Sequence, residues 1–119
     1  MIDVDIYALT DKILGEVFDD SFFRGMPEFG ENDEPDVYAV YTLREKPSFH
    51  ASDTNLAKTY WVEVSVFSAL AEPTLYEQVE DAFSDRDFMY DGGTDAGNKN
   101  IYPYKTQYVM DFTLDVYKN

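Results

Sequence analysis

The sequence predicts an α+β fold in which two helices pack on one face of a mixed, mostly antiparallel sheet of four to five strands. Its 119 residues are near the ordinary size of one domain, so residues 1–119 are expected to share one core. Apolar residues recur with helical spacing in two segments and alternate with polar residues in others. The resulting order, α-β-β-β-α-β-β, has helices at only two points and argues against a doubly wound nucleotide-binding sheet.

The first expected element is a helix within residues 3–18. Asp3 or Asp5 is suited to cap it, and its apolar residues are spaced by three and four. Those residues are Ile6, Leu9, Ile13 and Val17. A short strand is then expected over residues 22–26, followed by an acidic loop with glycine and proline over residues 27–36.

Two strands come next, separated by a long connection. Residues 37–44 are rich in β-branched and aromatic side chains, and residues 59–68 alternate between two faces. The two strands are expected to pair in antiparallel fashion. Their connection, residues 45–58, is much longer than the roughly two to five residues of common hairpin loops.

The second half begins with a helix expected within residues 69–85, with Pro73 near its first turn. Its apolar face comprises Leu75, Val79, Ala82 and Phe83. A short strand over residues 88–91 is expected to lead into a Gly- and Asn-rich loop over residues 91–103. The strongest alternation in the chain follows at residues 108–117 and predicts a long strand inside the sheet.

The charge balance limits the classes of partner. Nine basic and 24 acidic residues give a net charge of -15, which opposes tight wrapping around nucleic acid. The charge either serves a specific electrostatic role or keeps the protein dispersed, and the sequence leaves both open. The absence of cysteine is typical of a reducing compartment, and no run of apolar residues approaches the roughly 20 that cross a bilayer. An intracellular protein without membrane contact is expected.

A catalytic triad could be assembled around His50, the single histidine, from Ser48 or Ser52 and Asp53. Triad members usually come from different parts of a fold, whereas these residues are neighbours in one polar stretch. Contact residues in a loop are therefore the expected alternative. We expect no catalytic residue and no enzymatic activity.

A calcium site could be assembled from Asp91, Asp95 and Asn98. Their spacing departs from the EF-hand pattern and suits a Gly-rich turn equally well. A pair such as Glu63 and Asp111 indicates little about acid-base catalysis in a chain with 24 acidic residues. No metal and no cofactor are expected. The ten tyrosines fit a protein interface better than a platform for bases, because basic residues are few.

Six segments follow an order that is typical of one family. They are Tyr38–Leu43, Ser52–Asn55, Trp61–Phe67, Leu75–Phe83, Tyr90 with Asp91, and Tyr104–Tyr117. In pattern and order, residues 37–117 resemble the tail terminator, or tail completion, proteins of long-tailed phages and prophages of Gram-positive bacteria. That family typically has a Tyr-x-x-Tyr strand, an Asp-Asn loop element, a W-x-V-x-V strand, a helix, a Tyr-Asp motif and a long final strand. Here Asp53-Thr54-Asn55 replaces Asp-Asn, and the Gly-rich stretch before Tyr104 differs, which leaves the subfamily open.

The resemblance implies a structural subunit that assembles into a ring, usually a hexamer, on the end of the tail tube. Such a ring terminates tube growth and forms the interface to the head connector. The implied partners are further copies of this chain, the major tail tube protein, head-tail connector proteins, and DNA that passes through the ring without specific binding. The implied location is the head-proximal end of the virion tail, after assembly in the host cytoplasm.

Aromatic and polar residues of the long loops and of the sheet are the expected interface. They are Phe49, His50, Asp53, Asn55, Trp61, Phe67, Tyr90, Tyr102 and Tyr104. An acidic surface facing the channel would let phosphate backbones pass without adhering. Two alternatives stay open: another head-tail joining component, such as a stopper or neck protein, and a small metal-dependent hydrolase built on Asp91, Asp95 and His50.

Overall fold

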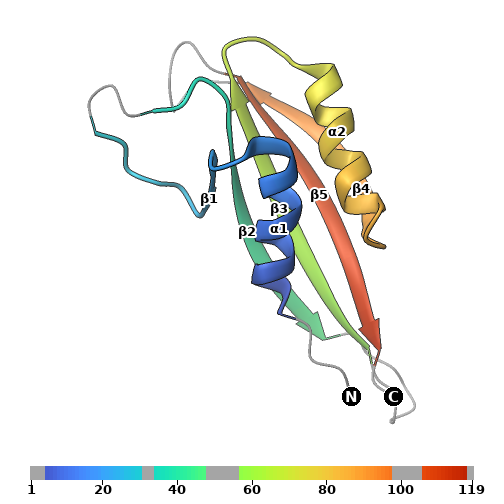
Figure 1. Ribbon diagram of the computed structural model, residues 1–119. Helices are drawn as coiled ribbons and strands as arrows, with labels where there is room; N and C mark the ends of the chain where they lie inside the picture. The colour runs from blue at the N-terminus through green and yellow to red at the C-terminus, as the bar shows by residue number, and fades with distance from the viewer. Residues whose placement is uncertain (1–4, 31–33, 48–56, 98–105, 118–119) are drawn as a thin grey trace.

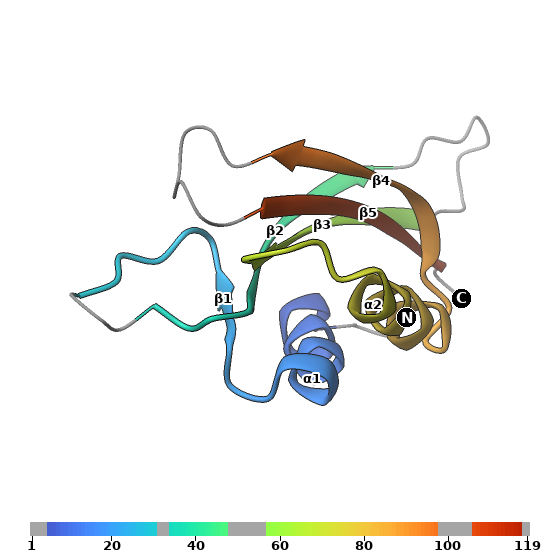
Figure 2. The same cartoon turned by 90° about the horizontal axis from the view of Figure 1, so that it is seen from above.

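The computed structural model describes residues 5–30, 34–47, 57–97 and 106–117. They form one five-stranded sheet, in the order β1-β2-β3-β5-β4, with two helices on one face (Figures 1 and 2). In chain order the elements are α1 (Ile6–Phe18), β1 (Phe22–Arg24), β2 (Tyr38–Pro47), β3 (Ala57–Ser68), α2 (Pro73–Ser84), β4 (Met89–Gly97) and β5 (Thr106–Tyr117). This order confirms the predicted α+β fold.

Helix α1 begins at Ile6, where Asp5 provides the cap by accepting a 3.0 Å hydrogen bond from the backbone N–H of Ala8. One turn further on, the Thr10 hydroxyl donates to the Ile6 carbonyl oxygen at 2.8 Å, so a polar residue is satisfied within the buried face. The helix ends at Phe18 because the next residue, Asp19, adopts a positive φ of 55°. The sequence had placed the cap at either of two aspartates, and the structure selects the second.

Three antiparallel pairings and one parallel pairing build the sheet. Strand β1 runs parallel to β2, whereas β2–β3, β3–β5 and β5–β4 are antiparallel. Strand β5 therefore lies between β3 and β4, which confirms the prediction that the final strand is internal. The sheet is long and narrow, and the molecule measures 51 × 24 × 23 Å.

Two loop expectations were wrong. Strand β2 extends to Pro47 and β3 begins at Ala57, so the connection spans residues 48–56 instead of 45–58. The stretch from Asp91 to Gly97, expected to be loop, belongs to strand β4. Glycine weakens a strand, but pairing with the long β5 overrides that preference, and the irregularity appears as register shifts instead. Gly92, with φ of +120°, lies at the first of these shifts.

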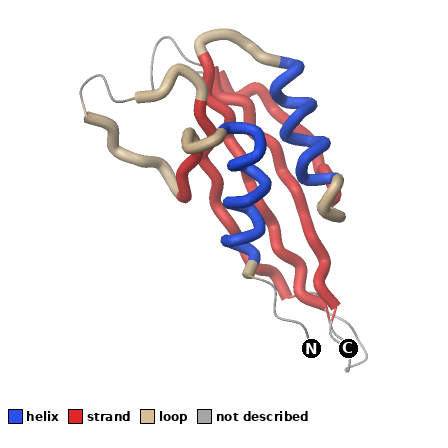
Figure 3. Tube along the Cα trace, viewed as in Figure 1, coloured by secondary structure: helices blue, strands red, loops and turns tan. Residues whose placement is uncertain are grey.

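The core lies between the helices and one sheet face, referred to below as the helix face (Figure 3). Fully buried side chains come from three neighbouring strands and both helices. The largest of them are Ile13, Leu14, Tyr41, Val62, Val64, Val66, Val79, Phe83, Met110 and Phe112. The rings of Phe83 and Phe112 stack with centroids 4.2 Å apart and join α2 to the centre of the sheet. Each such side chain contributes about 1.5–3 kcal/mol before conformational entropy is counted.

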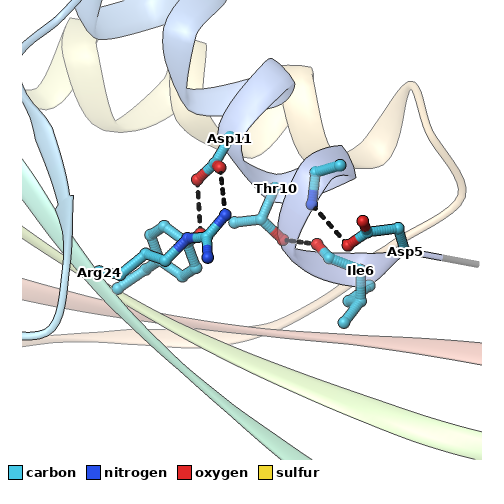
Figure 4. A network of polar contacts seen from close by, with 7 residues as sticks. Asp5, Ile6, Thr10, Asp11 and Arg24 are labelled. Carbon is cyan, nitrogen blue, oxygen red and sulfur yellow. Dashed lines mark hydrogen bonds and ion pairs between the residues drawn. The ribbon is translucent and has the colours of Figure 1, made fainter.

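A polar network joins α1 to β1 and β2 (Figure 4). Asp11 accepts from Arg24 at 2.6 Å and from the Tyr41 hydroxyl at 2.5 Å, while Arg24 Nε donates to the Tyr41 oxygen at 3.0 Å. Burial alone would raise the pKa of Asp11, but the bonds from Arg24 and Tyr41 outweigh it, and the pKa is lowered. Burial and the bond to Asp11 raise the pKa of Tyr41. The network stabilises the deprotonated carboxylate of Asp11 and the protonated phenol of Tyr41.

A second ion pair, between Arg86 and Glu16, joins the end of α2 to α1. Neither helix in the described part of the chain is long and apolar enough to span a bilayer.

Candidate interface surfaces

The sheet face opposite the helices, referred to below as the open face, carries the candidate site. In Figure 2 both helices lie on the other side of the sheet. The strand registers place alternate residues of each strand on this face. From β2, β3 and β5 they are Tyr38, Val40, Thr42, Arg44, Thr59, Trp61, Glu63, Ser65, Phe67, Gln107, Val109, Asp111, Thr113 and Asp115.

One end of the open face is an aromatic cluster. Tyr38 is fully buried and stacks on Phe67 with ring centroids 4.9 Å apart. Phe23 and Phe29 pack edge-on against Tyr38 from β1 and the loop that follows it. The buried Tyr38 hydroxyl donates a 2.8 Å hydrogen bond to Glu34. This end of the open face is therefore covered by the chain's own residues.

The centre of the open face is polar and carries a cation-π pair. Arg44 and Trp61 are directly opposite each other on β2 and β3, and the guanidinium lies 4.5 Å from the indole ring centroid. The geometry suits the attraction between a cation and the negative face of an aromatic ring. Trp61 is partly buried, yet its indole N–H has no hydrogen-bond partner among the described residues. The indole nitrogen itself is buried, so the missing hydrogen bond is a cost to the free protein.

Next to this pair, two carboxylates face each other across β3 and β5. Glu63 and Asp111 are direct partners in the register, so their side chains extend from the same face of adjacent strands. One carboxylate oxygen of Asp111, Oδ1, is buried and has no hydrogen-bond partner within the described part of the chain. Towards the far end, Asp115 accepts a 2.6 Å hydrogen bond from Thr59. The centre of the open face thus has an excess of negative charge and unused hydrogen-bonding capacity.

Tyrosines on the helix face form a separate cluster under α2. Tyr76 stacks on Tyr108 with centroids 4.1 Å apart, and Tyr90 packs on Phe112 at 5.3 Å. Burial raises the pKa of the Tyr90 phenol most, and the hydrogen bond with Tyr108 raises it further. A Cβ on Gly93 would lie 2.3 Å from the Tyr108 hydroxyl and 2.4 Å from that of Tyr90. Glycine at position 93 therefore provides the space in which the two hydroxyls meet.

Three of the residues expected at an interface are described, and they lie in different environments. Trp61 is on the open face, Phe67 is only 2% exposed within the aromatic cluster, and Tyr90 is partly buried on the helix face. The other six lie outside the described residues: Phe49, His50, Asp53, Asn55, Tyr102 and Tyr104. The described residues therefore do not form one continuous site from the expected set.

The residues considered for a hydrolase (Asp91, Asp95 and His50) and for a calcium site (Asp91, Asp95 and Asn98) are only partly described. Asp91 and Asp95 are exposed on β4, and His50 and Asn98 lie outside the described residues. In the part of the chain that is described, no three side chains of His, Cys, Asp or Glu form a group that could hold a metal ion.

Sequence reasoning missed the partners that define the open face. Arg44 was treated only as the end of a strand, and Tyr38 only as part of a motif. The signal was present in the alternation of β3, which places Trp61, Glu63 and Phe67 on the same face. The register with β2, which is not visible in the sequence, then brings Arg44 opposite Trp61.

No protein-family model matches this chain. No curated protein matches it significantly either. A solved structure described as the virion of a native gene transfer agent (GTA) particle contains a similar chain, with a TM-score of 0.61 and 12% sequence identity. The match covers 95% of this chain and 92% of that chain. At this identity the similarity shows a shared fold.

Proposed function

We propose that this protein is a structural component of a phage-like virion. The observation that carries the proposal is the fold it shares with a chain of the GTA virion, over 95% of one chain and 92% of the other. Because the match extends over nearly the whole of both chains, it is not confined to a single common motif. The role is one of assembly and requires no catalytic step, cofactor or metal.

Within the virion, we propose the role of tail terminator. Copies of the chain would form a ring, a hexamer by the family resemblance, on the end of the tail tube. The ring would stop tube growth and present a surface to the head connector proteins. Support comes from the order of the elements and the six sequence segments that resemble this family.

The charge distribution supports passage of DNA without specific binding. The chain has a net charge of -15, and Glu63 and Asp111 lie side by side on the open face. A surface with this sign repels phosphate, so a channel lined by it would not retain the genome as it passes. Basic residues that could neutralise several phosphates are scarce, at nine in the chain.

The test is assembly with the cognate major tail tube protein. Tubes grown in the presence of this protein should be shorter, and electron microscopy should show added density at one end. Light scattering coupled to size exclusion should detect a ring or a tube-bound species. A strict monomer that neither binds tubes nor limits their length would exclude the terminator role.

The same tube-assembly experiment distinguishes a tail terminator from a stopper or neck protein. A stopper or neck protein should bind head connector proteins while leaving tube length unchanged. Gene order offers an independent check, since a terminator gene is expected immediately before the gene for the major tail tube protein.

A further inference from the structure

Among the described residues, the sheet ends at β4 on one side and at β1 on the other, and β2 extends beyond the short β1. Two long stretches of edge therefore have no described strand beside them, and they differ in sequence and charge. One is the outer edge of β4, which has β5 as its only neighbouring strand in the sheet order. The other is the outer edge of β2 beyond Tyr41, where the short strand β1 has ended. We infer that the β4 edge of one copy pairs with the β2 edge of the next copy, so that the sheet continues from subunit to subunit. This inference rests on the ring assembly of the proposed function.

The β2 edge has backbone groups directed away from the sheet. Beside β1, the N–H of Ala39 donates to Ser21 and the carbonyl of Tyr41 accepts from Gly25. Strand geometry repeats every two residues, so the N–H and C=O of Leu43 point the same way. Strand β1 ends at Arg24, opposite Tyr41, and no described strand lies beside Leu43 on that side. Such unpaired groups form a template for another strand.

The β4 edge is also accessible. All residues from Asp91 to Ala96 are exposed, and α2 lies under the helix face of the sheet instead of along this edge (Figures 1 and 2). Register shifts at Tyr90/Gly92 and Asp95/Gly97 make the edge irregular. Irregular, charged edges resist indiscriminate pairing, so this edge requires a partner of complementary charge.

Strand directions make the two edges compatible. Strand β2 is antiparallel to β3, β3 to β5 and β5 to β4, so β4 runs opposite to β2. A neighbouring copy related by rotation about an axis to which the strands are tilted keeps its β2 close to the original direction. Its β2 would therefore meet β4 in antiparallel fashion, which is the pairing used through most of this sheet. The contact is heterologous, and repeated rotation closes it into a ring.

Charge favours this pairing over a β4–β4 pair. The described part of β4 contains Asp91 and Asp95 and no basic residue. The free part of β2, Thr-Leu-Arg-Glu-Lys-Pro, has two basic residues and one acidic residue, and Lys58 is opposite Pro47 on β3. These three of the chain's nine basic residues thus gather at one end of the β2–β3 pair. Opposite charges across neighbouring strands stabilise a pair, and like charges destabilise it.

The positions of the two edges along the strand direction also predict that neighbouring copies are offset from each other. Through the registers, Met89 of β4 is level with Arg44, whereas Gly97 is level with Tyr38. The β2 edge is free only from Thr42 onward, so pairing along most of β4 requires the neighbour to be displaced along the strands. Sheets that close on themselves require such a stagger. Displacements of two and four residues would bring Thr94 opposite Thr42 and Arg44, respectively.

Disulfide trapping tests this geometry, because the chain contains no cysteine. Thr42 and Thr94 are exposed, and the registers place both on the open face. The Thr42→Cys/Thr94→Cys and Arg44→Cys/Thr94→Cys variants would be oxidised, alone and with tail tubes, and run on a non-reducing gel. A matched control is Thr74→Cys/Thr94→Cys, in which the exposed Thr74 at the start of α2 replaces the β2 position.

We expect at least one of the two pairs to give a reducible ladder of dimers, trimers and larger rings, about tenfold more abundant than in the control because the edge contact raises the effective concentration of the thiols. Mixing the single variants of that pair should give dimers only. Dimers from Thr94→Cys alone would instead indicate a symmetric β4–β4 contact and overturn the inference. So would ladders no stronger than the control in both pairs.

The two proposals can fail separately. If no ladder forms but the protein still limits tube length, the edge pairing is excluded and the terminator role remains. If ladders form but tubes are neither bound nor limited, the ring geometry is supported and the terminator role is excluded.

Discussion

The helix face and the open face are built from the same strands, because consecutive residues of each strand point to opposite faces. On β3, Val62, Val64 and Val66 face the helices and are fully buried, whereas Trp61 and Glu63 face the other way and are partly exposed. The helix face is continuous and apolar. The open face is apolar at one end only, where β1 and its loop cover it. A strand can therefore supply stability through one set of residues and a contact surface through the other.

The two faces also differ in whether their polar groups are hydrogen-bonded. On the helix face, Thr10 and Tyr41 donate hydrogen bonds to Ile6 and Asp11, respectively. On the open face, the indole N–H of Trp61 and one oxygen of Asp111 have no partner among the described residues. Buried polar groups that lack partners cost free energy. We therefore expect substitutions on the two faces to change stability by different amounts, and in one case with opposite sign.

The largest effect is expected for Phe112→Ala on the helix face. Phe112 is fully buried and stacks on Phe83, so the substitution should lower the free energy of unfolding by about 3–5 kcal/mol. Its neighbour Thr113 points to the open face, and Thr113→Ala should cost less than about 1 kcal/mol. Urea unfolding followed by circular dichroism measures both. Equal losses for the two variants would contradict the distinction between the faces.

Phe67→Ala should give the next largest loss, although Phe67 lies on the open face. Its ring is 2% exposed and stacks on Tyr38, but the cluster around it is small and lies at one end of the sheet. The expected loss is about 3 kcal/mol, at the low end for such a substitution. Thermal unfolding would measure it. A loss below that of Thr113→Ala would show that the aromatic cluster is not a second core.

The layer architecture could be predicted from the sequence because both helices and most strands have strong periodicity. The alternation of β5 and the spacing of Ile13 and Val17 on α1 depend on local sequence alone. The start of β4 was predicted as a short strand over residues 88–91, but its continuation to Gly97 was not, because its glycines disfavour a strand locally and only the long partner β5 imposes the conformation. The extension of β2 to Pro47 was missed for the same reason, since it depends on pairing with β3.

The candidate site was predictable only in part. The composition of β3 pointed to Trp61 as a contact residue, and Glu63 and Asp111 could be named as a possible pair. Their position directly opposite each other depends on the β3–β5 register. The stack of Arg44 on Trp61 likewise depends on β2 pairing with β3 over ten residues. Registers of this kind are set by tertiary packing and by loop lengths, which short sequence patterns do not contain.

A pH-dependent effect is expected for Asp11→Asn, which acts where α1 meets β1 and β2. The pKa of Asp11 is lowered in the folded protein, so the unfolded chain binds the proton more readily. The stabilisation is present above the ordinary value of 3.8 and is lost as pH falls through the lower folded value. Asp11→Asn should cost about 1 kcal/mol at neutral pH, since the side chain is 32% exposed.

Chemical unfolding at a series of pH values measures this difference. The gap between wild type and Asp11→Asn should be constant near neutral pH and close in acid. Asp5→Asn is a suitable control, because asparagine also caps helices and can still accept from Ala8. A gap that persists unchanged below the folded pKa of Asp11 would show that the loss is unrelated to its charge.

The smallest effect, and the one with opposite sign, is expected for Asp111→Asn. Glu63 and Asp111 are directly opposite on β3 and β5, and like charges in that position are destabilising. The substitution removes one charge and adds an amide N–H that can donate to Glu63. We expect a gain of about 0.5 kcal/mol at neutral pH and low salt. The gain should shrink in about 0.5 M salt, because screening weakens the repulsion that is relieved.

Asp115→Asn provides the matched control on the same strand and face. Asp115 accepts a hydrogen bond from Thr59 and is opposite no acidic residue on β3, so its replacement should be neutral or slightly destabilising. Urea unfolding of both variants at two salt concentrations gives the comparison. If Asp111→Asn loses stability as Asp115→Asn does, Asp111 makes a favourable contact in the free protein. If Asp111→Asn gains stability and weakens tube binding, the charged centre of the open face costs stability in the free subunit and contributes to contact in the assembled one.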